Sequence, residues 1–240
     1  MYGALVMADV MSFSDEHGAQ DAADADPGRA LCRMFIDALP VAGASISVVT
    51  ERGSHSVVGA SDALAVKLEA LQFELGVGPH WEALRTEGPA FLWDAADMAG
   101  PNAWPTLALE TVRCGAGALF ALPLRLGAAT VGVADLYSRS PVERWSDEMI
   151  DVAQDLALSV AGRAVRLATR SAEAATSRTG RNAVELRREV HQATGMVMVQ
   201  LDCSASTALL RLRGQAFASG VPLAGLAREV ITRRFDFGQL

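Results

Sequence analysis

Lysine is almost missing from this 240-residue chain. Lys67 is the single lysine among 21 basic residues, and 28 acidic residues give a formal net charge of −7. Because alanine and arginine are abundant instead, we interpret the shortage as a bias of base composition rather than as a functional feature. Half of the residues are apolar, so the chain can bury one large core or two modest ones.

Cysteine is also scarce. Cys32, Cys114 and Cys203 are an odd number of thiols, and they lack the spacing of a metal site or a redox pair. This pattern argues against a disulfide framework and favours reduced, buried cysteines that behave as small apolar residues. Such usage is typical of a cytoplasmic protein, and this is the location we predict.

Apolar runs of membrane-spanning character are lacking as well. The first residues show no basic segment followed by an apolar one, so we expect no secretory signal. The most apolar stretch, residues 116–134, contains Pro123 and Arg125 and is split by a glycine-containing break. We interpret it as two β-strands rather than a membrane helix, and we predict no membrane partner.

Signatures of catalysis are missing too. There is no glycine-rich phosphate loop and no Ser-His-Asp order, and the neighbouring Asp94 and Asp97 stand in a polar loop where solvation explains them. His80, beside a Gly-Pro turn, is a candidate haem or metal ligand because imidazole suits both. A hydrogen-bonded or exposed histidine is the alternative that we favour for His80 and His55. We therefore predict no enzymatic activity, no metal site and no cofactor.

The charge that is present is unevenly distributed. From Arg163 to Leu240 the chain holds 12 arginines and 6 acidic residues, a charge of +6, whereas the preceding residues carry −13. A basic tail on an acidic body indicates a polyanion-binding module joined to a domain that does not bind polyanions. A solvated helical face is the alternative that charge alone leaves open.

Strands and helices alternate in the body of the chain. Residues 1–26 are rich in Ala, Asp, Ser and Gly, and we expect them to be disordered. Pro27 suits the first turn of a helix. The apolar pattern predicts strands at 44–50, 54–60, 90–93, 116–126 and 130–137, with helices between them. Hairpins join neighbouring strands, which predicts an α+β domain built on an antiparallel sheet.

Three motifs of the body resemble a GAF domain. L-P-L-R-L-G-A-A-T-V-G-V-A-D-L-Y, residues 122–137, looks like its central hairpin. W-S-D-E, residues 145–148, stands where such domains begin their closing helix, and L-Q-F-E-L-G-V-G-P-H, residues 71–80, is similar to a segment found in actinobacterial regulators. The resemblance covers about residues 28–165. It implies a pocket for a small ligand or a dimer scaffold, and it leaves the ligand unknown.

Three amphipathic helices are expected in the tail. They are predicted at residues 183–200, from Ser204 or Ser206 to Gly220, and from Pro222 to Phe235. Each has an apolar stripe at helical spacing, and three short helices can bury a shared core that none would bury alone.

This tail resembles an ANTAR domain over nearly all of residues 172–236. The residues that carry the resemblance are Arg187, Val190, Gln192, Ala193, Thr194, Gly195, Met196, Met198, Ala208, Leu212, Arg213, Ala216, Phe217, Leu223, Leu226 and Ala227. One departure is Thr194, where the family often has lysine, so one possible phosphate contact is lost.

The resemblance implies an RNA-binding regulator of transcription antitermination whose partners are paired stem-loops in nascent RNA. Arginine pairs with phosphate and stacks on unpaired bases. The predicted RNA-binding residues are Arg187, Arg188, His191, Gln192, Thr194, Arg211, Arg213, Arg228, Arg233 and Arg234. Phe217 is a stacking platform or, as we favour, a core residue. Gly195 costs about 1 kcal/mol against alanine and allows close approach of RNA or, as we favour, of a packing helix.

Two stem-loops are best held by two modules, so a homodimer is implied. A long helix is predicted from Ser146 to about residue 178, with a kink at Thr179 and Gly180. Its Leu156, Val160 and Leu167 suggest a dimer seam, and packing on its own domain is the alternative. We divide the chain into a disordered N-terminus (1–26), a GAF-like sensor domain (27–165), a helical connector (166–180) and an ANTAR RNA-binding domain (181–240).

Two other functions are weighed. A GAF-type methionine-sulfoxide reductase needs closely placed active-site cysteines, and the three cysteines lie in different predicted elements. A protein-interaction or DNA-binding regulator is the other alternative, although nothing strongly resembles a helix-turn-helix.

Overall fold

A computed structural model describes residues 26–49, 55–97, 104–175 and 183–239. The predicted disorder of residues 1–26 and the kink at Thr179 and Gly180 therefore fall, apart from Asp26, outside the described residues. No helix in the described ranges is both long enough and apolar enough to cross a membrane.

A five-stranded antiparallel sheet forms the centre of the body, in the order β2-β1-β5-β4-β3. Its strands are β1 (Gly43–Val49), β2 (His55–Ala60), β3 (Ala90–Leu92), β4 (Ala118–Leu126) and β5 (Ala129–Ser138). β4 and β5 form the predicted hairpin, joined at Gly127. The prediction of an α+β domain on an antiparallel sheet is confirmed.

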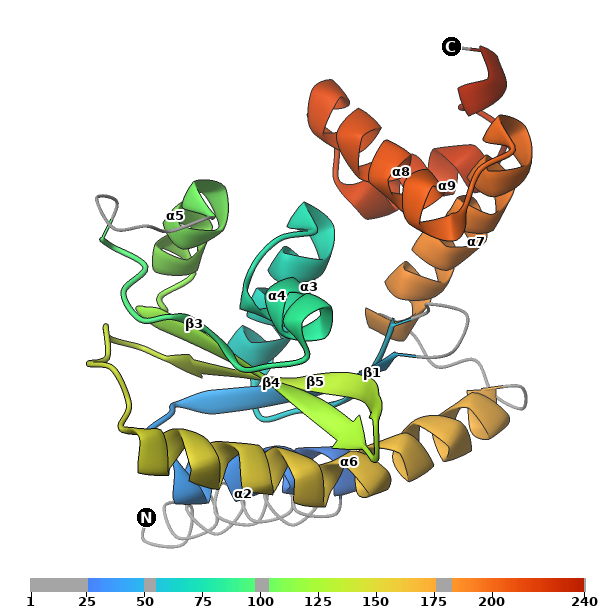
Figure 1. The fold of residues 1–240 in the computed structure, drawn as a ribbon. Helices are drawn as coiled ribbons and strands as arrows, with labels where there is room; N and C mark the ends of the chain where they lie inside the picture. Colours follow the sequence, from blue (N-terminus) through green and yellow to red (C-terminus); the bar gives the residue numbers. More distant parts are fainter. Residues whose placement is uncertain (1–25, 50–54, 98–103, 176–182, 240) are drawn as a thin grey trace, which may run out of the picture.

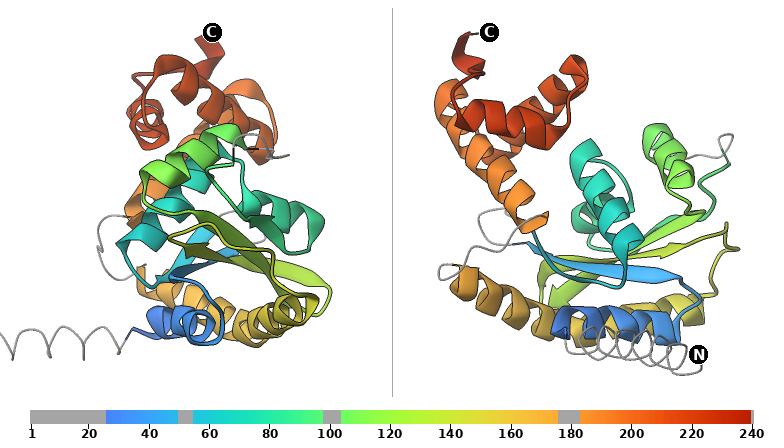
Figure 2. Two further views of the ribbon diagram at one scale, coloured as in Figure 1. Left: turned by 90° about the vertical axis from the view of Figure 1, so that its left-hand side faces the viewer. Right: turned by 180° about the vertical axis from the view of Figure 1, so that it is seen from behind.

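Helices cover both faces of this sheet (Figures 1 and 2). The covering helices are α2 (Pro27–Ala38) and α6 (Asp147–Ala175) on one face, and α3 (Ala63–Leu75), α4 (Pro79–Thr86) and α5 (Pro105–Arg113) on the other. Along β4, Phe120 and Leu122 face the core under α2 and α6, and Leu119 faces the core under α3 and α5. Because both faces are covered, β4 is apolar and buried without interruption from Ala118 to Leu124.

Local sequence explains where the helices begin. Asp26 accepts a hydrogen bond from the backbone of Gly28 and precedes Pro27, so α2 has both an N-cap and a helix-starting proline. Asp62 caps α3 in the same way through the amides of Leu64 and Ala65. The cap of α2 stands directly before Pro27, where the sequence predicts the first turn of a helix.

The three predicted tail helices are present as α7 (Ala183–Leu201), α8 (Ala205–Ser219) and α9 (Leu223–Ile231). Ser204 is the N-cap of α8 and Gly220, in the left-handed region, is its C-cap. Val190, Leu212 and Leu226 lie in their shared buried core. The third helix is shorter than predicted: it ends at Ile231, and Phe235 lies in the segment that folds back against α7 before the short 3-10 turn Phe237–Gln239.

The long helix α6 packs on its own domain. Val160 is fully buried in the core between α6 and the sheet, and Leu156 and Leu167 are half-buried against the same core. Of the two alternatives for this helix, the structure supports packing on the sheet. The proposed seam of Leu156, Val160 and Leu167 is therefore corrected, because the buried face of α6 already has a partner.

Candidate nucleic-acid interface

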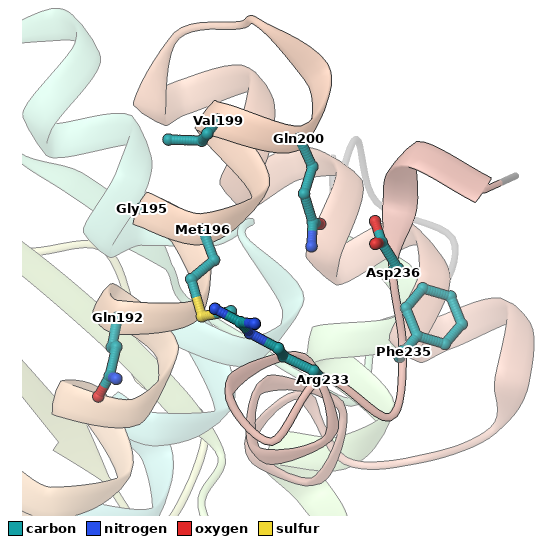
Figure 3. Close-up of a pocket in the computed structure, with 8 residues that line it drawn as sticks. All are labelled: Gln192, Gly195, Met196, Val199, Gln200, Arg233, Phe235 and Asp236. Atoms are coloured by element: carbon teal, nitrogen blue, oxygen red, sulfur yellow. The ribbon is translucent and has the colours of Figure 1, made fainter.

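A hollow of about 520 Å³ lies between α7 and the segment that follows α9. Its lining residues are Gln192, Gly195, Met196, Val199, Gln200, Arg233, Phe235 and Asp236 (Figure 3). The guanidinium of Arg233 and the thioether of Met196 point toward each other across it (Figure 3). The hollow thus combines apolar walls with amide, carboxylate and guanidinium groups, a composition suited to an unpaired base and its phosphate.

The segment after α9 forms one wall of the hollow, and it is held in place because it packs back against α7. The backbone amide of Phe237 donates to Oε1 of Gln200 at 3.2 Å, and the rings of Phe235 and Phe237 meet edge to face with centroids 5.0 Å apart. Arg233, at the start of this segment, has φ +57°, a backbone conformation that non-glycine residues seldom adopt. Pattern reasoning missed this wall because it treated Phe235 as helical.

Gly195 and Phe217, for which the sequence left two interpretations, are both exposed. No atom lies within 4 Å of the position of a Cβ added at Gly195, so the preferred interpretation, close packing of a helix, is wrong. Phe217 is 81% exposed, and its preferred assignment to the core is also wrong. Leu210, two turns earlier on α8, is 69% exposed. Because an exposed aromatic ring offers a face to a base, Phe217 becomes a candidate stacking residue.

Five of the eight predicted RNA-binding residues whose side chains are described lie on the surface. Gln192, Arg211, Arg228, Arg233 and Arg234 are exposed, and the structure brings Gln192 and Arg233 together in the hollow. Arg228 is also engaged by Glu189, whose two carboxylate oxygens accept from Nε and Nη2 at 3.1 and 3.0 Å. That bidentate pair ties α9 to α7. The side chains of Arg187 and Arg188, on α7, lie outside the part of the chain that is described.

Thr194 faces the interior instead of the surface. It is 7% exposed, and its hydroxyl donates to the carbonyl of Val190 at 2.7 Å. This placement does not offer the side chain to RNA, so the expectation of a direct contact from Thr194 is not supported. Helical spacing places Gln192 and Thr194 on opposite sides of α7, and only the packed core shows which side is outward.

Arg213 and His191 form a second group, turned toward the sheet domain. The Arg213 guanidinium carbon lies 4.7 Å from the ring centroid of Trp81 and 5.3 Å from that of Phe73. Its Nη2 donates to the carbonyl oxygen of Phe73 at 2.7 Å. The His191 ring meets Phe73 edge-on, with centroids 6.5 Å apart. Arg213 was predicted to bind RNA, and in this structure its side chain is half-buried at the junction of the two domains.

Buried polar groups lie beneath that junction. Asp135 is bonded through Oδ2 to Nδ1 of His80 at 2.8 Å and accepts at Oδ1 from Nε2 of Gln72 at 3.2 Å. Gln72 in turn accepts from the backbone amide of His80 at 2.9 Å. His80 is thus a buried, hydrogen-bonded histidine, as its favoured interpretation predicted. Within the described residues no group of three or more metal-binding side chains is assembled.

The space beside these groups is very small. A cavity of about 10 Å³ is lined by polar side chains that include Ser45, Glu69, Gln72, Asp135 and Tyr137. This volume accommodates about one water molecule. A larger ligand entering here has to displace α3 or the side chains that it contributes.

The cysteines do not form a redox centre. Cys32, Cys114 and Cys203 are all free thiols, and they lie in three separate packed clusters. Burial, with a smaller effect of Asp26 and Asp62, raises the pKa of Cys32 to about 12. A nucleophilic thiol requires a lowered pKa, so the environment of Cys32 opposes that chemistry.

Two protein families match the chain. The GAF domain family matches residues 28–162, and the ANTAR domain family matches residues 179–231. A search of curated proteins finds no match.

Several solved structures are similar to the body of the chain. A domain named for a two-component sensor histidine kinase from Sinorhizobium meliloti 1021 is 24% identical, with a TM-score of 0.46, over 60% of this chain and 92% of that one. The second GAF domain of DevS from Mycobacterium smegmatis is 18% identical, with a TM-score of 0.40, over 63% and 98%. A free methionine-R-sulfoxide reductase from Thermoplasma acidophilum is 15% identical, with a TM-score of 0.40, over 58% and 89%.

The sheet domain with its small buried cavity and the arginine-rich helical trio thus correspond to the two matched families. Together they imply an RNA-binding regulator of antitermination, and regulators of this architecture are typically not enzymes. The chain belongs to the GAF family and has GAF–ANTAR architecture, with the GAF domain preceding the ANTAR domain.

Proposed function

We propose that this chain binds paired stem-loops of nascent RNA through its ANTAR domain and thereby prevents transcription termination. The GAF domain acts as the sensor or dimer scaffold that controls this binding. The observation that carries the proposal is the open hollow between α7 and the segment after α9, with Gln192 and Arg233 on its walls.

The chemistry of the hollow supports a single-stranded loop as the ligand. Gln192 offers an amide for base edges, and Arg233 offers a planar cation for phosphate or for stacking. Gly195 leaves one side of the hollow without a side chain, so a nucleotide approaches the backbone of α7. Duplex recognition is less favoured, because an A-form major groove is too narrow for side chains to read.

Paired stem-loops imply two ANTAR domains, so we propose a homodimer. The buried face of α6 is occupied by its own sheet, and the dimer contact therefore uses another surface. A signal bound in the GAF domain remains part of the proposal, with its chemical identity open.

The central test is an electrophoretic shift with the full chain. Tandem stem-loop RNA, a single stem-loop and duplex DNA are compared at low salt and then over a salt series. We expect the tandem RNA to bind most tightly and its affinity to fall steeply as salt rises, because arginine contacts release counterions. Absence of binding to any stem-loop at low salt would contradict the function, and preference for duplex DNA would favour a DNA-binding regulator.

The remaining candidate function is a redox enzyme. The separated cysteines and the raised pKa of Cys32 argue against it. Thiol titration together with an assay for reduction of methionine sulfoxide is the direct test, and we expect no turnover.

A further inference from the structure

Arg213 of the ANTAR domain is held by a group of GAF side chains and backbone atoms. Its guanidinium carbon lies 4.7 Å from the ring centroid of Trp81 and 5.3 Å from that of Phe73, within the range of cation–π attraction. The carbonyl oxygen of Phe73 accepts from Nη2 at 2.7 Å. Two aromatic rings and one carbonyl thus make a receptor for a guanidinium on the α3–α4 face of the GAF domain.

Gly76 shapes the same receptor. It ends α3 with φ +68°, and a Cβ at this position would lie 2.8 Å from Nη1 of Arg213 and 3.1 Å from its Cδ. A side chain at residue 76 would therefore intrude on the arginine. The turn that joins α3 to α4 leaves room for the long side chain coming from α8.

The receptor lacks an anion. Among the described residues no carboxylate forms an ion pair with Arg213, and its Nε has no hydrogen-bond partner. Burial lowers the pKa of this guanidinium to about 10. A desolvated cation without an anion is held less firmly than one paired with phosphate, which gives short, bidentate, charge-assisted hydrogen bonds. An RNA phosphate is therefore a stronger partner for Arg213 than the aromatic rings are.

The receptor is also connected to the buried polar groups of the GAF domain. The indole Nε1 of Trp81 donates to the carbonyl oxygen of Gln72 at 2.7 Å, and the Gln72 side chain is bonded to Asp135 and to the amide of His80. Gln72 and Asp135 line the cavity of about 10 Å³. A ligand that enlarges this cavity by displacing Gln72 disturbs the residue whose backbone carbonyl holds Trp81.

We propose that the Phe73–Trp81 face of the GAF domain is an intramolecular receptor for Arg213 that competes with RNA, so that the docked chain is the state of low RNA affinity. This inference rests on the proposed RNA-binding function and adds the regulation of that site. In the docked chain Arg213 is withdrawn from solvent and His191 lies against Phe73, so two of the predicted RNA-binding side chains are covered together. Release of the ANTAR domain from the GAF domain exposes both.

The test uses the full chain with Trp81→Leu, which removes the aromatic face and keeps apolar bulk. Phe73→Leu is the second variant, used if Trp81→Leu does not fold as judged by circular dichroism and thermal melting. Arg213→Gln removes the cation, and Arg211→Gln is its matched control because Arg211 is exposed on the same helix. Docking is measured without RNA by hydrogen exchange of residues 71–82, and affinity is measured with tandem stem-loop RNA.

We expect faster exchange in Trp81→Leu and Arg213→Gln, and wild-type exchange in Arg211→Gln. We also expect Trp81→Leu to bind the RNA about tenfold more tightly than wild type, the scale of a desolvated cation–π contact expressed as an equilibrium constant. Arg213→Gln should bind RNA with a salt dependence reduced by about one unit of slope, because one phosphate contact is lost.

Different failures have different meanings. If Trp81→Leu undocks the domains but binds RNA no more tightly than wild type, the competition is refuted while the RNA-binding function stands. If exchange of residues 71–82 changes in neither variant, the receptor does not hold the domains together and the inference is refuted. If neither the wild type nor the undocked variants bind any stem-loop, the proposed function fails and the inference falls with it.

Discussion

At the scale of single residues, Arg233 combines an unfavourable backbone with an exposed cation at the hollow. Its φ of +57° costs about 1 kcal/mol relative to an ordinary conformation, because an L residue crowds its own carbonyl there. Glycine would adopt the same backbone without strain. We propose that Arg233 occupies this position because its side chain lines the hollow.

Arg233→Gly separates folding from binding. We expect the free energy of unfolding to change by less than about 1 kcal/mol, since relief of strain is offset by the greater freedom of glycine in the unfolded chain. RNA affinity should fall about tenfold at low salt, with a shallower salt dependence, because one charged contact is lost. Chemical denaturation and a salt series of RNA titrations measure the two effects.

Thr194→Val serves as the control. Thr194 lies next to Gly195 on α7, but its side chain faces the core and not the hollow. It should bind RNA like the wild type. An unchanged affinity and salt slope in Arg233→Gly would remove Arg233 from the interface.

The lowered pKa of Asp62 predicts that the stability of the GAF domain depends on pH. Burial raises the pKa of this carboxyl, but hydrogen bonds from Ser61, Ala65, Tyr137 and Leu64 together bring it below its ordinary value. A lowered folded-state pKa means that the ionised group stabilises the fold above its unfolded pKa of about 3.9. This contribution is lost as pH falls through the folded-state value.

The corresponding substitution is Asp62→Asn. We expect it to lower GAF stability near pH 7 and to cost progressively less as pH falls below about 4, because the wild-type carboxyl is then protonated too. Thermal melting of both proteins at pH 7 and pH 3 measures the difference. A destabilisation that stays the same at both pH values would show that the charge of Asp62 is not responsible.

At the scale of secondary-structure elements, α8 shows how the ANTAR trio is delimited. The Ser204 side chain accepts from the amide of Thr207 at 3.2 Å, and Gly220 at φ +64° ends the helix. Both signals are local in the sequence. They place Arg211 and Arg213 in the middle of the helix, where their side chains project from a rigid backbone.

Ser204→Ala should destabilise the ANTAR domain by about 1 kcal/mol, the usual cost of losing an N-cap. Ser159→Ala is the matched control, since Ser159 is an exposed residue within α6 whose hydroxyl donates to the carbonyl of Leu156. Alanine is a better helix former at such a site, so the control should be neutral or slightly stabilising. Equal effects of the two substitutions in chemical denaturation would argue against the cap.

At the scale of the whole molecule, the chain places an acidic sensor against a basic output domain. Figure 1 shows the C-terminal helices on the side of the sheet that carries α3 and α4, while α2 and α6 cover the opposite side. The arginine-rich C-terminal helices are thus positioned over the α3–α4 face, and the contact made by Arg213 links the two domains.

The role of α6 in assembly is tested by two substitutions on its opposite sides. Val160→Ala should lower the free energy of GAF unfolding by about 2 kcal/mol, because it opens a cavity in a fully buried site. Leu158→Ala, at a position 57% exposed, should change it by less than about 0.5 kcal/mol. Native mass spectrometry should give the wild-type stoichiometry for Val160→Ala. Loss of the dimer in that variant, with the fold intact, would restore the helix as a seam.

Much of the fold was predictable because its signals are local. Asp62, Ser204 and Gly220 mark helix ends through their own hydrogen bonds and backbone preferences. Two apolar runs on either side of the break at Gly127 indicate the hairpin. The candidate interface was predictable only in part. Gln192, named among the RNA-binding residues, is exposed. The preferred interpretations of Gly195 as a packing residue and of Phe217 as a core residue were wrong, because both are exposed.

The amino-acid order by itself determined the antiparallel sensor fold, the three-helix output domain and the concentration of arginine in the latter, because each depends on residues a few positions apart. Only the tertiary structure decided that Thr194 faces inward, that Phe217 faces water and that Arg213 lies on Trp81. Those outcomes depend on which surfaces meet after the chain has folded, and residues 140 positions apart carry no local signal of their contact.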